Sequence, residues 1–382
     1  MTGTIASLAD IARAQTCARL VIKVGSALLV QGGQPRRQWL AGLAGEIAAA
    51  QARGQQVIVV SSGAIALGAA RLGLAKGGRG SLADAQAAAA VGQIGLGGLW
   101  AELLGEHGLT AAQLLLTLDD LEDRRRYLNA SATLNRLLEA GAVPVVNEND
   151  SVATQEIRFG DNDRLAARVA QAGRADAVLL LSDIDGLYDR NPKEPGARMI
   201  PLVRGVTAEI HAMADGGSAS GLGSGGMTSK LQAAEIAGRA GIALAIINGT
   251  HDAPIGRALG LSGGGEIGTL FLPRRRDPAR KAWLGGRMKI KGVLTVDDGA
   301  AGALVSGRSL LAKGIAGVTG DFVRGDVVEV RSATGQALAK GLAEYDAAEC
   351  VAIMGRHTDE QADLLGYAPR NAVIHRDQMV LL

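Results

Sequence analysis

The sequence predicts an α/β protein, a three-layer sandwich around a mostly parallel central sheet, followed by a small, mostly β module. First, short apolar runs alternate with longer segments of helical periodicity through residues 19–272. Second, the 382-residue chain is 47% hydrophobic but only 3% aromatic and has 54 glycines. Such a core is aliphatic and rich in glycine turns, as in parallel sheets covered by helices. Third, beyond residue 272 the pattern changes to short β-like runs.

The expected strands are short apolar runs, several of which end in glycine or polar residues, and the expected helices repeat their apolar positions with a period near 3.6. The strands are predicted at residues 20–24, 57–60, 113–116, 143–146, 178–181 and 244–247. The helices are predicted at residues 38–53, 81–105, 121–140, 164–172 and 230–240. Strands and helices in this order predict helices on both faces of the sheet.

Four segments are expected along the chain. Residues 1–18 form an N-terminal extension, 19–272 the large α/β domain, 273–287 a basic linker and 288–382 the β module. Proline, glycine and like charges mark the linker. Within the module we expect strands near 292–296, 326–330 and 372–375, with residues 321–330 forming a strand pair around a tight turn. The module is long enough to fold as a domain.

Composition favours a cytoplasmic protein. The formal net charge is +2, so the overall charge of the chain does not favour binding to nucleic acid or to an anionic membrane. Cys17 and Cys350 are isolated, which argues against a disulfide framework or a zinc site. The N-terminal residues do not resemble a signal peptide, and no uncharged run of about 18 apolar residues is present. We therefore expect no membrane segment.

A dense polar cluster follows the expected strand 143–146. It contains Asn147, Glu148, Asn149, Asp150, Asp161, Asn162 and Asp163. Carboxylates and amides packed so closely after an apolar strand are costly unless something binds them. In an open α/β sheet, ligands bind beyond the carboxyl ends of the strands. The alternative is a polar turn in which Asp161 caps the helix 164–172, but one cap leaves the other side chains unexplained.

Two further strand ends carry candidate ligand groups. Lys23 precedes a glycine turn at the end of the first strand, where it could face an anion or extend to solvent. The sequence Ser61-Ser62-Gly63-Ala64 ends the second strand and opens a helix. Its hydroxyls and backbone N–H groups could hold a carboxylate or phosphate, although Ser-Gly is also an ordinary turn.

A glycine-rich loop, residues 218–230, precedes the expected helix that carries Lys230. Successive glycines could wrap phosphates, with Thr228 or Ser229 starting the helix, although the loop does not fit the Walker A register and could be a linker. After strand 178–181, Asp183 and Asp185 could bind ribose hydroxyls or Mg²⁺, or form an Asp-rich turn. Two lysines, a glycine loop and carboxylates together indicate phosphoryl transfer, and no Ser-His-Asp or Cys-His set competes.

These motifs resemble the amino acid kinase superfamily, and within it the kinases that act on free glutamate. The resemblance runs over almost the whole chain from residue 19. It rests on Val-Ile-Lys-Val-Gly-Ser, Ser-Ser-Gly-Ala-Ile-Ala, Asp-Arg-Arg-Arg-Tyr-Leu-Asn-Ala, Val-Asn-Glu-Asn-Asp, Gly-Asp-Asn-Asp and Ser-Gly-Leu-Gly-Ser-Gly-Gly-Met. The tail resembles a PUA domain through Leu-Ala-Lys-Gly-Ile and Gly-Asp-Phe-Val-Arg-Gly-Asp. Departures are small: Ala27, Ser61 and Arg164 stand where relatives commonly have other residues.

The resemblance implies a reaction and assigns roles. The reaction is ATP-dependent phosphorylation of the side-chain carboxylate of L-glutamate to L-glutamyl 5-phosphate, the first step of proline biosynthesis from glutamate, with Mg²⁺ accompanying ATP. The implied catalytic residues are Lys23, Lys230 and Asp163, and the implied glutamate-binding residues are Ser62, Asp150 and Asn162. The implied nucleotide-binding residues are Lys23, Ser182, Asp183, Ser224, Gly225, Gly226, Met227, Thr228, Ser229 and Lys230. No protein-bound metal site is implied.

Other functions are weighed against this one. A sister kinase could act on N-acetylglutamate or aspartate, but an acetylated substrate would leave Asp150 without an ammonium group to bind. PUA domains elsewhere bind RNA, yet residues 292–382 contain twelve Asp/Glu against eight Lys/Arg, so RNA binding is not expected. The resemblance also implies a homo-oligomer, a dimer or tetramer, and feedback inhibition by proline.

Overall fold

The computed structural model describes residues 3–152, 161–215, 224–273 except 262 and 264, and 290–382 except 371. It divides into two units. The first comprises Met1–Glu122 with Asn129–Arg275, and the second Asp123–Leu128 with Arg276–Leu382. Most of the expected linker, and residues 218–223 of the expected glycine-rich loop, lie outside the described residues.

The first unit is built on an eight-stranded sheet of order β5-β6-β4-β1-β7-β9-β10-β8. In that order the strands are Ala111–Leu116, Val143–Glu148, Gln56–Ser61, Arg19–Val24, Ala177–Ser182, Ala243–Asn248, Thr269–Leu272 and Leu202–Arg204. Strands β5, β6, β4, β1, β7 and β9 run parallel, whereas β10 pairs antiparallel with β9 and parallel with β8. All six expected strands of this domain are present. Strands β8 and β10, which complete one edge, were not expected from the sequence.

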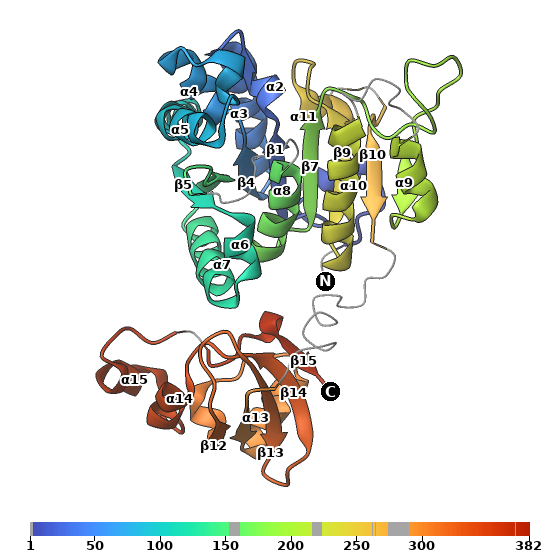
Figure 1. Cartoon of the computed structure of the whole chain (residues 1–382). Coiled ribbons are helices and arrows are strands. Elements are labelled where there is room, and N and C mark those ends of the chain that lie inside the picture. Colours follow the sequence, from blue (N-terminus) through green and yellow to red (C-terminus); the bar gives the residue numbers. More distant parts are fainter. Residues whose placement is uncertain are drawn as a thin grey trace. The chain divides into compact units, whose positions relative to one another are not determined.

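Helices cover both faces of this sheet (Figure 1). Helices α3 (Arg37–Ala52), α5 (Leu82–Gly105) and α11 (Pro254–Ala258) pack on one face. Helices α8 (Asp161–Ala172) and α10 (Ser224–Arg239) pack on the other. Alternate residues of a strand point to opposite faces, so Leu20, Ile22 and Val24 of β1 join the core beneath α3, while Lys23 faces the α8 layer. The predicted three-layer sandwich is confirmed.

The remaining elements of the first unit connect these layers. They are α1 (Leu8–Ile11), α2 (Ser26–Leu29), β2 (Val30–Gln31), β3 (Gln34–Pro35), α4 (Ala64–Leu72), the 3₁₀ turn η1 (Ala75–Gly78), α6 (Leu118–Glu122), α7 (Arg124–Glu139) and α9 (Ala208–Asp215). Two expectations were wrong. The single helix expected over residues 121–140 is replaced by α6 and α7, which break at residue 123. Helix α10 begins at residue 224 rather than at 228 or 229, which places Lys230 in its second turn.

Helices α4 and α5 approach each other closely through two glycines. A methyl group on Gly68 would lie 1.8 Å from the carbonyl oxygen of Ala88, and one on Gly92 would lie 1.8 Å from that of Ala64. No side chain fits such a gap, so both positions require glycine. Helix α5 is also long and apolar enough to match a membrane span by length and composition, but 44% of its most apolar window is buried. Its buried leucines and Trp100 belong to the main core, and its buried alanines form a smaller cluster with α4.

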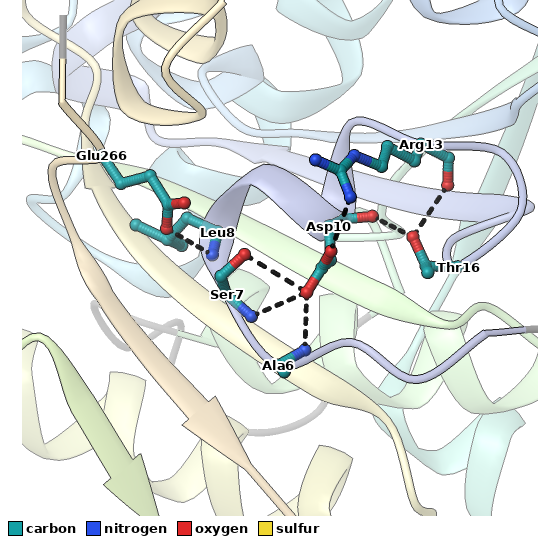
Figure 2. A network of polar contacts seen from close by, with 7 residues as sticks. All are labelled: Ala6, Ser7, Leu8, Asp10, Arg13, Thr16 and Glu266. Atoms are coloured by element: carbon teal, nitrogen blue, oxygen red, sulfur yellow. Dashed lines mark hydrogen bonds and ion pairs between the residues drawn. The ribbon is translucent and has the colours of Figure 1, made fainter.

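The N-terminal segment is anchored to the first unit before β1 begins (Figure 2). One carboxylate oxygen of Asp10 accepts hydrogen bonds from the backbone N–H groups of Ala6 and Ser7, at 2.9 and 3.0 Å. These bonds, the one from Ala6 foremost, hold the pKa of Asp10 below its ordinary value. Glu266 accepts from the backbone N–H of Leu8 at 2.8 Å. Because Leu8 is also buried in the main core, this segment is part of the packed unit.

The second unit contains a five-stranded sheet of order β12-β11-β13-β14-β15. These strands are Ile315–Gly320, Gly292–Val296, Val327–Ser332, Ala337–Leu342 and Met379–Leu381. The other elements are α13 (Asp298–Val305), η2 (Ala312–Gly314), α14 (Ala347–Ile353), α15 (Thr358–Leu365) and η3 (Arg376–Gln378). The expected strand pair within residues 321–330 was wrong: the first half is a turn, and β13 pairs with β11 and β14. No strand forms at residues 372–375.

Candidate active site

The carboxyl ends of four neighbouring parallel strands, β6, β4, β1 and β7, open into one cavity of about 260 Å³ in the first unit. Because parallel strands end at the same edge of a sheet, residues distant in sequence meet there. The lining includes the predicted residues Lys23, Ser62, Asp150, Asn162, Asp163, Ser182, Asp183, Gly226 and Lys230. It also includes Asn147 and Glu148 of the predicted polar cluster, which were given no individual role, and Arg79, which was not predicted. Ligands in α/β proteins bind at such an edge.

Two buried charged side chains, Lys23 and Asp163, and the partly buried Lys230 form the centre of this cavity. Lys23 Nζ lies 2.7 Å from Oδ1 of Asp163, and Lys230 Nζ lies 3.2 Å from Oδ2 of the same carboxylate. Lys23 comes from β1, Asp163 from the first turn of α8 and Lys230 from α10. Asp163 is 1% exposed and Lys23 is 7% exposed. A single carboxylate thus holds two ammonium groups at one end of the cavity.

Burial and pairing shift the pKa values of this group in opposite ways. Burial lowers the pKa of Lys23 and outweighs the attraction of Asp163, with Lys230 adding repulsion. Burial by itself would raise the pKa of Asp163, but the two ammonium groups outweigh it and hold the pKa below its ordinary value. Asp163 therefore stays ionised at neutral pH. The trio carries two positive charges against one negative charge when both lysines are protonated.

A second group, made of a hydroxyl, an amide and a carboxylate, lies on the β4 and β6 side. Asn162 Nδ2 donates a hydrogen bond to Ser62 Oγ at 2.8 Å, and Asn162 Oδ1 is buried without a hydrogen-bond partner among the described residues. Ser62 leads through Gly63, whose φ of 105° requires glycine, into helix α4. Asp150 follows β6 and is 8% exposed. This arrangement offers a hydroxyl, an amide and a carboxylate to a small polar ligand.

The predicted nucleotide-binding residues lie on the α10 and β7 side. Ser182 ends β7 and donates to the adjacent Asp183 carboxylate at 3.2 Å. Ser229 Oγ donates to Asp163 at 3.4 Å, which links α10 to the charged trio. Met227 and Thr228 are half-buried in α10, and Ser224 and Gly225 open this helix. Asp185 does not line the cavity; it accepts hydrogen bonds from Asn248 at 2.9 Å and Tyr188 at 3.2 Å.

Helix α5 supplies two contacts that the sequence analysis did not anticipate. Gln93 Oε1 accepts a hydrogen bond from Asn147 Nδ2 at 2.7 Å, and Trp100 Nε1 donates to Ser61 Oγ at 2.9 Å. Both bonds end at residues beside the cavity, although Gln93 and Trp100 do not line it. In sequence each pair is separated by 54 or 39 residues, so no local motif signals them. The one feature of the sequence that could have indicated these contacts is a polar residue on the buried side of an apolar helix.

A second, larger cavity of about 390 Å³ lies between the β2–β3 hairpin, α4 and α5. It contains none of the predicted site residues. Its charged lining consists of Arg37, Arg71 and Glu102, of which Arg37 and Glu102 pair with each other. Because it lacks the buried lysines and the convergent strand ends, we place the candidate active site in the smaller cavity.

Comparisons with known proteins show the family to which the chain belongs. The family described as "Amino acid kinase family" matches residues 18–248, and the "PUA domain" family matches residues 292–365. A glutamate 5-kinase from Novosphingobium aromaticivorans is 70% identical over 99% of this chain and 100% of its own length. One from Sphingopyxis alaskensis is 61% identical over 96% of this chain and 98% of its own. A carbamate kinase from Giardia lamblia aligns with 67% of this chain and 98% of its own at 16% identity and a TM-score of 0.48, a likeness too distant to inform the site.

The fold, the charged trio and the family match define the class of protein: the chain belongs to the amino acid kinase family, with a PUA domain at residues 292–365. Within that family, identities of 70%, 61% and 55% to three curated relatives over nearly full length place it among the glutamate 5-kinases.

Proposed function

We propose that this protein transfers the terminal phosphoryl group of ATP to the side-chain carboxylate of L-glutamate. The product is L-glutamyl 5-phosphate, and the reaction is the first step of proline biosynthesis from glutamate. The observation that carries the proposal is the pairing of Asp163 with both Lys23 and Lys230, at 2.7 and 3.2 Å. Membership of the glutamate 5-kinases supports the choice of substrate.

The chemistry needs positive charge and alignment rather than a base. A glutamate side chain has a reference pKa of about 4.3, so the attacking carboxylate is already ionised at neutral pH. In phosphoryl transfer, catalysis consists mostly of in-line positioning and stabilisation of the charge on the transferring group. Lys23 and Lys230 supply this charge. Asp163 pairs with both lysines and acts by holding them in place.

The second group, beside the trio, orients the substrate. Asp150 receives the α-ammonium group of glutamate, Asn162 offers both an amide donor and an acceptor, and the turn at Ser62 and Gly63 holds a carboxylate. Gly63 starts helix α4, whose first N–H groups point towards the cavity end of the helix, where an anion is favoured. In this orientation the side-chain carboxylate extends towards the lysines.

ATP occupies the side formed by β7 and α10, with Ser182, Asp183 and residues 224–230 around it. Mg²⁺ accompanies ATP. No group of three or more His, Cys, Asp or Glu side chains that could hold a metal ion occurs in the described part of the chain. This donor set still fits Mg²⁺, which usually keeps several waters and binds through substrate phosphates and one or two carboxylates. Asp183 is exposed in the cavity and could contribute one such oxygen. When bound, the ion would neutralise phosphate charge.

The proposed location, assembly and regulation of the protein rest on the same assignment. We propose a cytoplasmic enzyme that acts on glutamate and ATP, assembles as a dimer or tetramer and is inhibited by proline at or near the glutamate pocket. The net negative charge of the PUA domain does not favour RNA binding.

The direct test is ATP turnover by the purified protein with Mg²⁺ and hydroxylamine, which traps an acyl phosphate as a hydroxamate. L-glutamate, N-acetylglutamate and L-aspartate are compared under identical conditions. Hydroxamate formed with L-glutamate alone is the expected result. Turnover with N-acetylglutamate or aspartate in preference to glutamate would overturn the substrate assignment, and no hydroxamate with any of them would overturn the reaction.

A further inference from the structure

We propose that Gln93 of helix α5 is a positioning residue for substrate recognition: it orients the side-chain amide of Asn147 so that Oδ1 of Asn147 accepts a hydrogen bond from the ammonium group of the substrate. The proposal rests on the proposed function and names a determinant of specificity within the same site.

The first support is the environment of Asn147. It lies in β6, is 2% exposed and lines the cavity with Asp150. Its Nδ2 donates to Gln93 Oε1 at 2.7 Å, while its Oδ1 is buried with no hydrogen-bond partner among the residues that the structure describes. Buried polar atoms are nearly always paired, so an unpaired one beside a cavity calls for a ligand atom. This oxygen needs a donor.

The second support is the chemistry of the substrate. At neutral pH free glutamate carries two carboxylates, which only accept hydrogen bonds, and one ammonium group, which only donates. The ammonium group is therefore the one part of glutamate that can satisfy the Asn147 oxygen. Asp150 follows the same strand end and offers a negative charge to the same group. An amide oxygen and a carboxylate together suit an ammonium group.

The third support is the direction of the bond from Gln93. An asparagine amide has a donor end and an acceptor end, and a rotation of half a turn exchanges them. Because Gln93 accepts through Oε1, it holds the donor end of Asn147 towards α5 and leaves the acceptor end for the ligand. Gln93 does not itself line the cavity. It acts through Asn147.

Helix α5 is suited to this role because it is fixed at several points. Trp100, about two turns further along and 1% exposed, donates to Ser61 in the neighbouring strand β4. Gly92, next to Gln93, packs directly on the backbone of α4. Side chains whose surroundings are packed in this way hold a hydrogen-bonding geometry better than side chains on loops.

The test compares the unchanged chain with Gln93→Met and Gln93→Glu. Methionine keeps the size of the side chain but cannot accept the bond as glutamine does; glutamate keeps the accepting oxygen. KM and kcat are measured for L-glutamate and ATP, and L-glutamate binding is titrated by calorimetry. Glutarate, which has both carboxylates but no ammonium group, is measured as an alternative substrate or, failing turnover, as a competitive inhibitor.

We expect Gln93→Met to raise KM and Kd for L-glutamate by about tenfold, as the loss of one well-oriented hydrogen bond to a charged group does. KM for ATP and the affinity for glutarate should stay within about twofold, and Gln93→Glu should recover most of the glutamate affinity. An unchanged glutamate KM in Gln93→Met, or an equal loss for glutarate, would overturn the proposal. So would a Gln93→Glu enzyme that melts normally but binds glutamate as poorly as Gln93→Met.

The same experiments separate this proposal from the proposed function. An unchanged chain that binds L-glutamate but forms no hydroxamate would contradict the reaction, while the calorimetric comparison of the variants would still decide the role of Gln93. An unchanged chain that does not bind L-glutamate would overturn both.

Discussion

The two ends of the candidate active site are built from different interactions. At one end, full charges meet in a buried group in which Asp163 pairs with Lys23 and Lys230. At the other end, amides and a hydroxyl hydrogen-bond to one another beside the single carboxylate of Asp150. Asn162 donates to Ser62 at 2.8 Å, and Asn147 donates to Gln93 at 2.7 Å. The paired charges produce a strong local electrostatic field, and the hydrogen bonds fix the orientation of the side chains that face the ligand.

This difference indicates a division of labour. Burying charges is expensive, and pairing offsets that cost only in part, so a buried trio with an excess positive charge fits a place where negative charge accumulates during reaction. Neutral hydrogen bonds cost less to bury and discriminate by direction. We therefore expect substitutions in the Lys23–Asp163–Lys230 group to act on kcat and substitutions at the other end to act on KM for glutamate.

The largest effect is expected for Lys230→Ala. Loss of one positive charge next to the transferring phosphoryl group should lower kcat by about 10²- to 10³-fold, with a smaller change in KM for glutamate. Initial rates measured with saturating substrates test this. Lys193→Ala removes an exposed lysine outside the cavity and should leave the rates unchanged. A kcat near that of the unchanged chain would remove Lys230 from the reaction.

The next effect is expected for Asp150→Asn. Removing the negative charge that faces the ammonium group should raise KM for L-glutamate by about tenfold or more, with a modest effect on KM for ATP. Asp363→Asn changes an exposed carboxylate of the PUA domain and serves as the control. Equal losses for both substrates would contradict the assignment of Asp150 to glutamate.

A smaller effect concerns pH. Burial lowers the pKa of Lys23 from its ordinary value of 10.5, so this lysine loses its proton at a lower pH than an exposed lysine does. The catalytic charge is present below that pKa and is lost as pH rises through it. The pH dependence of kcat/KM for ATP, which reports the free enzyme, should therefore fall on the alkaline side below 10.5. A kcat/KM that stays constant up to the ordinary pKa of a lysine would contradict the burial of a functional Lys23.

The smallest effect is expected at the cysteines. Burial raises the pKa of the Cys350 thiol to about 12 and also raises that of Cys17. The reactive thiolate is therefore scarce at both positions, and treatment of the folded protein with iodoacetamide at mildly alkaline pH should leave both thiols and the activity unchanged. Mass spectrometry should find two modified cysteines only after denaturation. Rapid modification of the native chain would show that the packing around them is looser than described.

The fold could be predicted from sequence where the local pattern and the packing agree. Strands β1, β4, β6, β7 and β9 are apolar runs that end in polar residues, and burial on both faces explains their composition. Strands β8 and β10 were missed because they are three and four residues long and gain their pairing only from each other and β9. The start of α10 was misplaced because its first turn is Ser-Gly-Gly, which has low helix propensity.

The site could be predicted only in part, for a similar reason. Lys23, Asp163 and Lys230 stand out because charged residues next to apolar strands and glycine turns are costly without partners. Gln93 and Trp100 do not stand out, because a single polar atom on a buried helix face is common. Which residue it bonds to depends on how α5 packs against β4 and β6. Tertiary contacts of this kind leave no mark in the spacing of residues.

The division between the two ends is tested most directly by a double-mutant cycle of Lys230→Ala and Asp150→Asn, with kcat and both KM values measured for all four proteins. Independent sites should give effects on kcat/KM that add within about 0.5 kcal/mol, with the double variant combining the low kcat of one parent and the high glutamate KM of the other. A double variant no worse than Lys230→Ala alone, or single variants that lower kcat and raise KM alike, would show that the ends act as one unit and would contradict the account.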